Sequence, residues 1–175
     1  MDCQRLQEND ALDWIASGAF RQARQPPKGT LSDWANANLV LSAEDASEPG
    51  KYSTSRAPYQ REMMDAISDP IYSEVVFMTS SQVGKTMIEK AALGYYIDQD
   101  PSPILVVLPT IDLAETFSKD RLAPMLRDTP ALRGKIADPR SRDSGNTILH
   151  KRFPGGHMTM VGANAPAGLA MRPIR

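Results

Sequence analysis

The residues best suited to chemistry lie in the segment 79–86, which runs Thr-Ser-Ser-Gln-Val-Gly-Lys-Thr. Its end, Gly84-Lys85-Thr86, matches the phosphate-loop pattern G-x-x-x-x-G-K-[S/T], although Thr79 replaces the opening glycine. In such a loop, backbone N–H groups face the phosphates of ATP, and a glycine lets the backbone approach them closely. The lysine ammonium lies at the β- and γ-phosphates, and the threonine hydroxyl binds Mg²⁺.

The segment therefore predicts an ATP site in which Lys85 is the catalytic cation and Thr86 is the magnesium ligand. The predicted contacts with the nucleotide are Ser80, Ser81, Gln82, Val83, Gly84, Lys85 and Thr86. Gly-Lys-Thr alone is a weak signal, because a surface loop can contain it by chance. The neighbouring segments strengthen the prediction if they form a strand before the loop and a helix after it.

The flanking sequence predicts these elements. The run 75–78 is wholly apolar, which is typical of a strand buried on both faces, and 87–97 has helical spacing. A second apolar run, 104–108, predicts another strand, and 111–126 predicts another helix. This order predicts an α/β fold of the P-loop NTPase type, with a mainly parallel sheet, flanking helices and further helices before the sheet.

The apolar candidates of the helix after 104–108 are Leu113, Phe117 and Leu122. Short strands are expected at 147–150 and 158–161, because Phe153-Pro154-Gly155-Gly156 between them suits a hairpin turn. The methionines, including Met63, Met64, Met78 and Met87, are expected to fill the core.

The N-terminal part is predicted to be helical and extended. Helices are expected at 6–24, at 30–41 with Thr30 or Ser32 as the cap, and at 59–67. The polar segment 42–57 is expected to be an arm or loop. We therefore predict an N-terminal arm, residues 1–50, and a partial ATPase domain with an incomplete sheet, residues 51–175.

Composition sets broad limits. The 175 residues carry a net charge of −1, which gives no overall signature of nucleic-acid binding but allows a local basic patch. The single cysteine, Cys3, cannot form an internal disulfide, so a cytosolic protein is the natural interpretation. No signal peptide and no apolar run of membrane-spanning length is present in the sequence.

Other residues have a functional and a structural interpretation. Tyr59 and Gln60 suit adenine, because an aromatic ring stacks on a base and an amide pairs with its edge, but they also suit an exposed helix start. His150 and His157 lack a third ligand nearby, so surface histidines are favoured over a metal site.

The stretch 144–175 contains basic residues and no acidic one. It could meet phosphates of DNA or ATP, but a solvated hairpin and tail is the favoured interpretation. Its basic side chains are Lys151, Arg152, Arg172 and Arg175, of which the last two could also sense ATP.

A P-loop ATPase also needs acidic residues after a later strand, one for Mg²⁺ and one to activate water. No apolar strand followed by Asp-Glu occurs after Lys85, and the last acidic residue is Asp143. Truncation is the simplest explanation, so we expect weak binding of MgATP and little turnover.

The chain resembles the large terminase subunit of tailed phages, in the lambda-like family. The resemblance is carried by landmarks that run in order over residues 31–175. These are Leu31-Ser32-Asp33-Trp34-Ala35, Glu48-Pro49-Gly50-Lys51-Tyr52, Ala57-Pro58-Tyr59-Gln60, Ser81-Gln82-Val83-Gly84-Lys85-Thr86, Leu108-Pro109-Thr110, Phe117-Ser118-Lys119-Asp120-Arg121-Leu122-Ala123-Pro124-Met125-Leu126, Thr129-Pro130-Ala131-Leu132, Phe153-Pro154-Gly155-Gly156-His157 and Arg172-Pro173-Ile174-Arg175.

The resemblance implies an ATPase that drives double-stranded DNA into a procapsid in the host cytoplasm, with a nuclease domain that is absent from this chain. It implies the small terminase subunit, bound through residues 1–30, and the procapsid portal as partners, and a homo-oligomer for the full-length protein. Tyr59 and Gln60 match the adenine-binding position of the family. Thr79, Ser80 and Ser81 are uncharged where the family often has Arg or Lys, so an auxiliary γ-phosphate contact is expected to be absent.

Two other functions remain open from the sequence. One is a helicase-like or kinase-like P-loop enzyme of another family, although the further helicase motifs and a kinase lid are not visible. The other is an inactive remnant that only binds a partner through its N-terminal helices.

Overall fold

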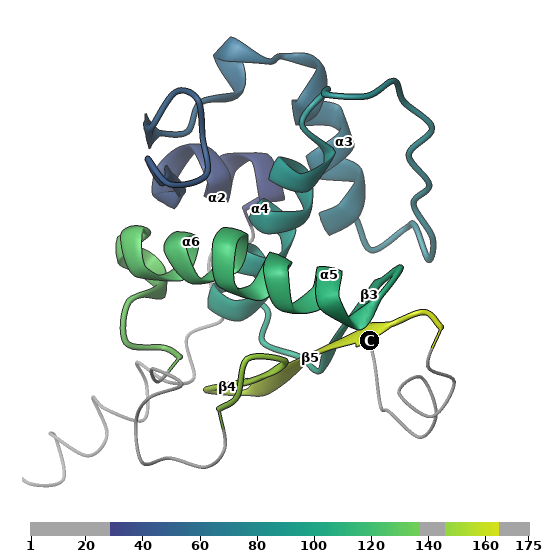
Figure 1. The fold of residues 1–175 in the computed structure, drawn as a ribbon. Coiled ribbons are helices and arrows are strands. Elements are labelled where there is room, and N and C mark those ends of the chain that lie inside the picture. The colour runs from purple at the N-terminus through teal and green to yellow at the C-terminus, as the bar shows by residue number, and fades with distance from the viewer. Residues whose placement is uncertain (1–28, 137–145, 165–175) are drawn as a thin grey trace, which may run out of the picture.

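A three-stranded sheet lies under a layer of helices in the computed structural model, which describes residues 29–136 and 146–164 (Figure 1). Its strands are β3 (Ile104–Leu108), β4 (His150–Phe153) and β5 (Gly156–Gly162), in the spatial order β3-β5-β4. The pair β3–β5 is parallel, with Ile104 opposite Met158, whereas β4–β5 is antiparallel. The α/β class is confirmed, but the sheet is mixed rather than mainly parallel.

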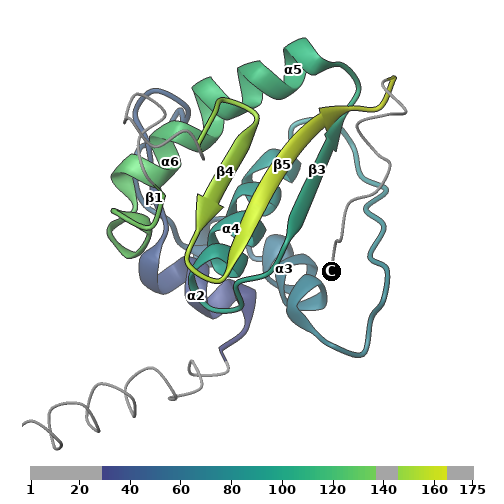
Figure 2. The same ribbon diagram turned by 90° about the horizontal axis from the view of Figure 1, so that it is seen from below.

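The hairpin that adds the antiparallel strand has the predicted turn, because Pro154 and Gly155 connect β4 to β5. The predicted strand at 147–150 is misplaced, since β4 begins at His150. The backbone N–H of Thr147 donates to the carbonyl of His150 at 2.8 Å, which closes a bend at residues 148–149 just before the strand. Figure 2 shows β5 between its two neighbours, so β3 is an edge strand in the described part of the chain.

The segment 75–78, predicted as a buried strand, does not form one. It runs in an irregular path along the outside of the molecule between two helices (Figure 1). Val76 is 77% exposed and Met78 is 97% exposed. The prediction that Met78 fills the core is therefore wrong. Of the four residues in this run, only Phe77 packs against the core. A strand requires a hydrogen-bonded neighbour, and no described strand pairs with this run, so apolar character alone does not produce one.

The helices before the sheet are α2 (Leu31–Asn38), α3 (Tyr59–Ser68) and α4 (Lys85–Asp98). Thr30 caps α2 as predicted, because its side chain accepts from the backbone N–H of Asp33. The helix ends before residue 41, because Val40–Leu41 forms β1, which pairs with β2 (Gly50–Lys51) in a short antiparallel hairpin. The predicted helix 6–24 lies outside the described residues, and the boundary at residue 50 stays a prediction.

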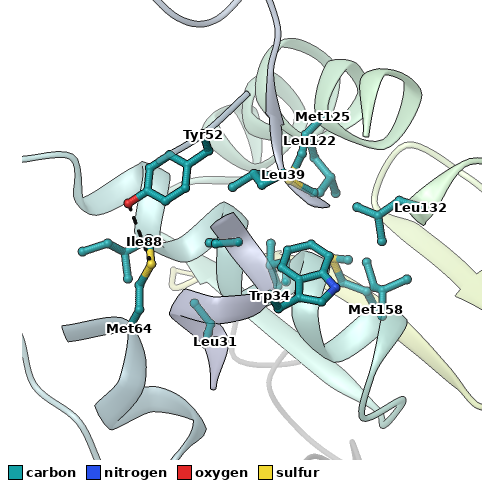
Figure 3. Packing of buried hydrophobic residues seen from close by; sticks show 14 of the residues in the cluster. Leu31, Trp34, Leu39, Tyr52, Met64, Ile88, Leu122, Met125, Leu132 and Met158 are labelled. Carbon is teal, nitrogen blue, oxygen red and sulfur yellow. Dashed lines mark hydrogen bonds between the residues drawn. The ribbon is translucent and has the colours of Figure 1, made fainter. Parts of the chain in front are cut away.

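The core joins these helices to the sheet, and Figure 3 shows Trp34 of α2 beside Leu132 and Met158. Trp34 lies directly on Gly94 of α4, where an added Cβ would be 2.4 Å from its ring. A glycine is therefore required for α2 and α4 to approach so closely. The methionines of the core include Met64 and Met158, each fully buried, as their flexible side chains allow.

The predicted helix 111–126 is continuous but changes its winding. It consists of α5 (Ile111–Thr116), a π-helical segment η2 (Phe117–Leu122) and α6 (Ala123–Asp128). Phe117 and Leu122 are both buried although they are five residues apart, which fits the wider π turn. Leu113, which ordinary helical spacing assigns to the core, is 48% exposed, and the adjacent Ala114 is buried instead. Two single turns complete the described elements, η1 (Thr54–Arg56) and η3 (Pro130–Leu132).

Among the described residues, no helix is both long and apolar enough to cross a membrane.

Asp98, at the end of α4, links three parts of the fold. Its carboxylate accepts from the indole N–H of Trp34 at 2.7 Å and pairs with Lys135. Burial raises the pKa of Asp98, but hydrogen bonds from Lys135, Gln99 and Trp34 and the charge of Lys135 outweigh burial and hold that pKa below its ordinary value. The ionised carboxylate therefore stabilises the fold above the unfolded-state pKa of about 4, and this contribution is lost as the pH falls through the lower folded-state pKa.

We predict that Asp98→Asn lowers the free energy of unfolding by about 1–3 kcal/mol at pH 7, because charged hydrogen bonds are lost. The difference from the wild type should shrink as the pH falls below about 4. Urea unfolding followed by circular dichroism over this pH range measures it. Glu115→Gln, in the exposed Lys119–Glu115 pair, is the control and should change stability little. A difference that stays the same down to the lowest pH at which the protein folds would contradict the assignment.

Candidate nucleotide-binding loop

The loop before α4 does not follow a strand, contrary to the expectation for a phosphate loop, but it leads into a helix through a left-handed glycine as expected. Gly84 is the N-cap of α4 with φ of 86°, and Gln82 also has a positive φ, of 59°. Such a conformation is uncommon for a residue with a Cβ and is found preferentially at functional sites. No side chain caps α4. In the described part of the chain, no acceptor is assigned to the backbone N–H groups of Lys85 and Thr86, which are free for an anion.

The side chain of Lys85 folds back over this loop. Its ammonium donates to the carbonyl of Ser80 at 2.7 Å and to the hydroxyl of Thr79 at 3.3 Å. The segment 79–85 therefore closes around the Lys85 ammonium. Thr79, Ser80 and Ser81 are exposed, so the outer side of the loop faces solvent. A ligand with negative charge can reach both the ammonium and the first amides of α4.

Two side chains of α3 fix the last turn of the loop. The Tyr59 hydroxyl donates to the carbonyl of Val83 at 3.2 Å, and the Gln60 amide donates to the same carbonyl at 3.0 Å. These bonds bring the two predicted adenine contacts next to the phosphate loop. Tyr59 is 56% exposed, so its ring is accessible. The structure thus shows one role for both residues, the fixing of Val83, which sequence spacing does not reveal, while the adenine contact stays a prediction.

Gln60 is itself held from the other side. Its amide oxygen accepts from the Tyr52 hydroxyl at 2.8 Å, and Tyr52 also reaches the sulfur of Met64 (Figure 3). Burial, and to a lesser extent the neighbouring Tyr59, raise the pKa of Tyr52 to about 12, so this hydroxyl remains a donor at neutral pH. Gln60 therefore retains one N–H and one lone pair for a ligand.

A cavity of about 470 Å³ lies next to the loop. It is bounded on one side by the start of α4, with Gly84, Thr86 and Met87, and on another by Gln60 and Tyr52. Its size suits the nucleoside part of a nucleotide. The charged side chains that line it are Asp45, Glu48, Lys51, Arg56, Lys90 and Arg121.

The remaining candidate residues lie in other places. His150 and His157 face each other across the hairpin with ring centroids 5.6 Å apart, and His150 Nδ1 is 3.1 Å from the Thr159 hydroxyl. Within residues 29–136 and 146–164, no group of three or more His, Cys, Asp or Glu residues is arranged for a metal. Lys151 is 3% exposed and donates to the carbonyl of Thr147, so it does not form part of a basic surface. Arg172 and Arg175 lie outside the described residues.

Comparison with known proteins identifies the class. The sequence profile of an ATPase domain, described as "Phage terminase large subunit gpA, ATPase domain", matches residues 46–175. The chain therefore belongs to the phage terminase large subunit family and matches the ATPase domain of that family. This confirms the resemblance drawn from the sequence motifs and favours the terminase over a helicase-like enzyme of another family.

Two curated relatives agree with this assignment. The terminase large subunit of Escherichia phage lambda is 30% identical over 156 residues, which cover 89% of this chain and 24% of that protein. The terminase large subunit of Enterobacteria phage P21 is 29% identical over 147 residues, which cover 84% of this chain and 22% of that protein. The chain thus spans about a quarter of the length of these relatives. No solved structure matches the chain.

We predict that Gly84→Ala disturbs the loop more than its positive φ alone explains. A Cβ at this position would lie 2.3 Å from the Gln60 amide nitrogen, so the bond to Val83 must break or the loop must shift. Gly134→Ala is the matched control, because Gly134 has φ of 76° and nothing within 4 Å of an added Cβ. We expect the change at Gly84 to cost about 1–3 kcal/mol more in unfolding free energy. Equal losses for the two variants would show that the clash with Gln60 is absent.

Proposed function

We propose that the chain binds MgATP, with the triphosphate on the loop 79–86 and the nucleoside in the adjoining cavity. The observation that carries this proposal is the Gly84 junction, which presents free amides of α4 beside the Lys85 ammonium. The backbone amides and the ammonium are the groups that bind phosphate oxygens. In this role Lys85 leaves the oxygens of Ser80 and Thr79 and turns to the phosphates. The amides of residues 80–84 supply the rest of the cradle.

The residues present also fit Mg²⁺ bound with the nucleotide. Thr86 is exposed, lines the cavity, and directly follows Lys85 at the start of α4. A hydroxyl at this position is a suitable oxygen ligand for magnesium that is mainly held by phosphates and water. When bound, the ion would neutralise charge on the phosphates. Thr86 is the residue of this chain that would orient it.

At the other end of the nucleotide, we propose that Tyr59 stacks on the adenine and that Gln60 pairs with its edge. The Tyr59 ring is exposed just outside the lining of the cavity, with its hydroxyl on the Val83 carbonyl. Gln60 is 5% exposed and lines the cavity, and its bonds to Tyr52 and Val83 leave one N–H and one lone pair for a base. Because the same two residues hold the Val83 carbonyl, binding of the base and the shape of the phosphate loop are linked through α3.

ATPase activity is the activity of the family. We propose that this chain contributes the nucleotide-binding part of a motor that drives double-stranded DNA into a procapsid, with the small terminase subunit and the portal as partners. The two acidic residues that line the cavity are engaged by cations, Glu48 by Arg56 at 2.8 Å and Asp45 by Lys90. Neither carboxylate is therefore free to activate water. We expect the chain to bind MgATP but to hydrolyse little of it.

We predict that Lys85→Ala weakens MgATP binding about 10-fold or more, because a charged contact with the phosphates is lost. Isothermal titration calorimetry on the purified chain measures this. Lys119→Ala, which removes an exposed lysine of η2 paired with Glu115, is the matched control and should bind as the wild type does. Unchanged affinity in Lys85→Ala would place the triphosphate elsewhere. A wild-type chain that binds no nucleotide would support the partner-binding remnant instead.

A further inference from the structure

One wall of the cavity is the loop 42–49, which connects β1 to β2. These strands have two residues each, so their pairing holds the loop only weakly. The loop is instead attached through its carboxylates. Glu44 pairs with Arg127 at 2.9 Å and Glu48 with Arg56 at 2.8 Å, and all four side chains are more than half exposed. Exposed pairs of this kind contribute little.

Asp45 differs from these neighbours. Its side chain is 2% exposed and pairs both with Lys90 of α4, whose side chain is 8% exposed, and with Arg121 of η2. Burial raises the pKa of Asp45, but the hydrogen bonds and charges of Lys90 and Arg121 outweigh burial and bring that pKa below its ordinary value. Asp45 is therefore a buried carboxylate that stays ionised and joins the loop to two helical segments.

The position of Lys90 connects this cluster to the phosphate loop. Thr86, Met87 and Lys90 lie on one face of α4, because residues three and four apart are neighbours on a helix, and all three line the cavity. Lys90 is thus one turn beyond the residues that we assign to the triphosphate. Without Asp45, its ammonium would be an unpaired cation in the cavity and would compete with Lys85 for phosphate.

We propose that Asp45 is a positioning residue for the nucleoside end of ATP: it fixes the loop 42–49 as the cavity wall and neutralises Lys90, so that phosphates bind only at the loop 79–86. The inference rests on the proposed function. Asp45 is not a ligand in this account, because its carboxylate is enclosed and already holds two cations. Its loss should therefore weaken the binding of the base and ribose without weakening the binding of the triphosphate.

The test compares MgATP with magnesium tripolyphosphate, which has the phosphates but no nucleoside. NMR titration of the full chain gives both dissociation constants. For Asp45→Asn we expect MgATP binding to weaken about 10-fold, while tripolyphosphate binding stays within about twofold or becomes tighter. Glu44→Gln is the matched control, because Glu44 lies in the same loop but does not line the cavity, and it should bind both ligands as the wild type does.

A second variant covers the case in which Asp45→Asn does not fold. Arg121→Gln removes the half-exposed partner and leaves the buried Asp45–Lys90 pair intact, and it should weaken MgATP binding selectively but less. An equal loss for both ligands, or no loss for either, in whichever variant folds would overturn the role of Asp45. A wild-type chain that binds neither ligand would instead refute the proposed function. One that binds tripolyphosphate as tightly as MgATP would refute the placement of the nucleoside, and the role of Asp45 with it.

Discussion

The site depends on one junction, at which the carbonyl of Val83 is held by two side chains of α3 while Gly84 turns into the first residue of α4. The turn requires the left-handed conformation at Gly84. It leaves the first amides of the helix without internal acceptors, which is the physical basis of an anion site at a helix N-terminus. The core that packs α2, α3 and α4 together serves this junction, because it fixes α3 relative to α4.

The charges of the chain support the same arrangement. The net charge of −1 gives no sign of a charged surface. The carboxylates of the loop 42–49 nevertheless form ion pairs with four cationic side chains, which come from the 54–56 turn, α4, η2 and α6. Only Asp45 is enclosed, and a buried carboxylate that loses its partners is strongly destabilising. The near-neutral net charge therefore hides two kinds of ion pair on this loop: exposed pairs, of which Glu48–Arg56 lines the cavity, and the buried Asp45 cluster in the cavity wall.

The sequence predicted local structure well where the signal is local. Thr30 as a cap, the 153–156 turn and the loop-to-helix transition, expected at residue 87 and found at residue 85, follow from side-chain chemistry and glycine placement. It failed where the outcome depends on distant partners. The 75–78 run resembles a buried strand but pairs with no strand within residues 29–136 and 146–164, and the π turn shifts the buried face of the 111–128 helix. The Asp45–Lys90 contact joins residues 45 apart, so no sequence pattern indicates it.

The central claim is that the Gly84 junction and Lys85 hold a triphosphate. A crystal structure of the chain with Mg²⁺ and a non-hydrolysable ATP analogue tests it most directly. The account predicts phosphate oxygens within hydrogen-bond distance of the backbone N–H groups of Lys85 and Thr86, with the Lys85 ammonium moved from the carbonyl of Ser80 to the phosphates. A nucleotide bound elsewhere, with Lys85 still on Ser80, would contradict it.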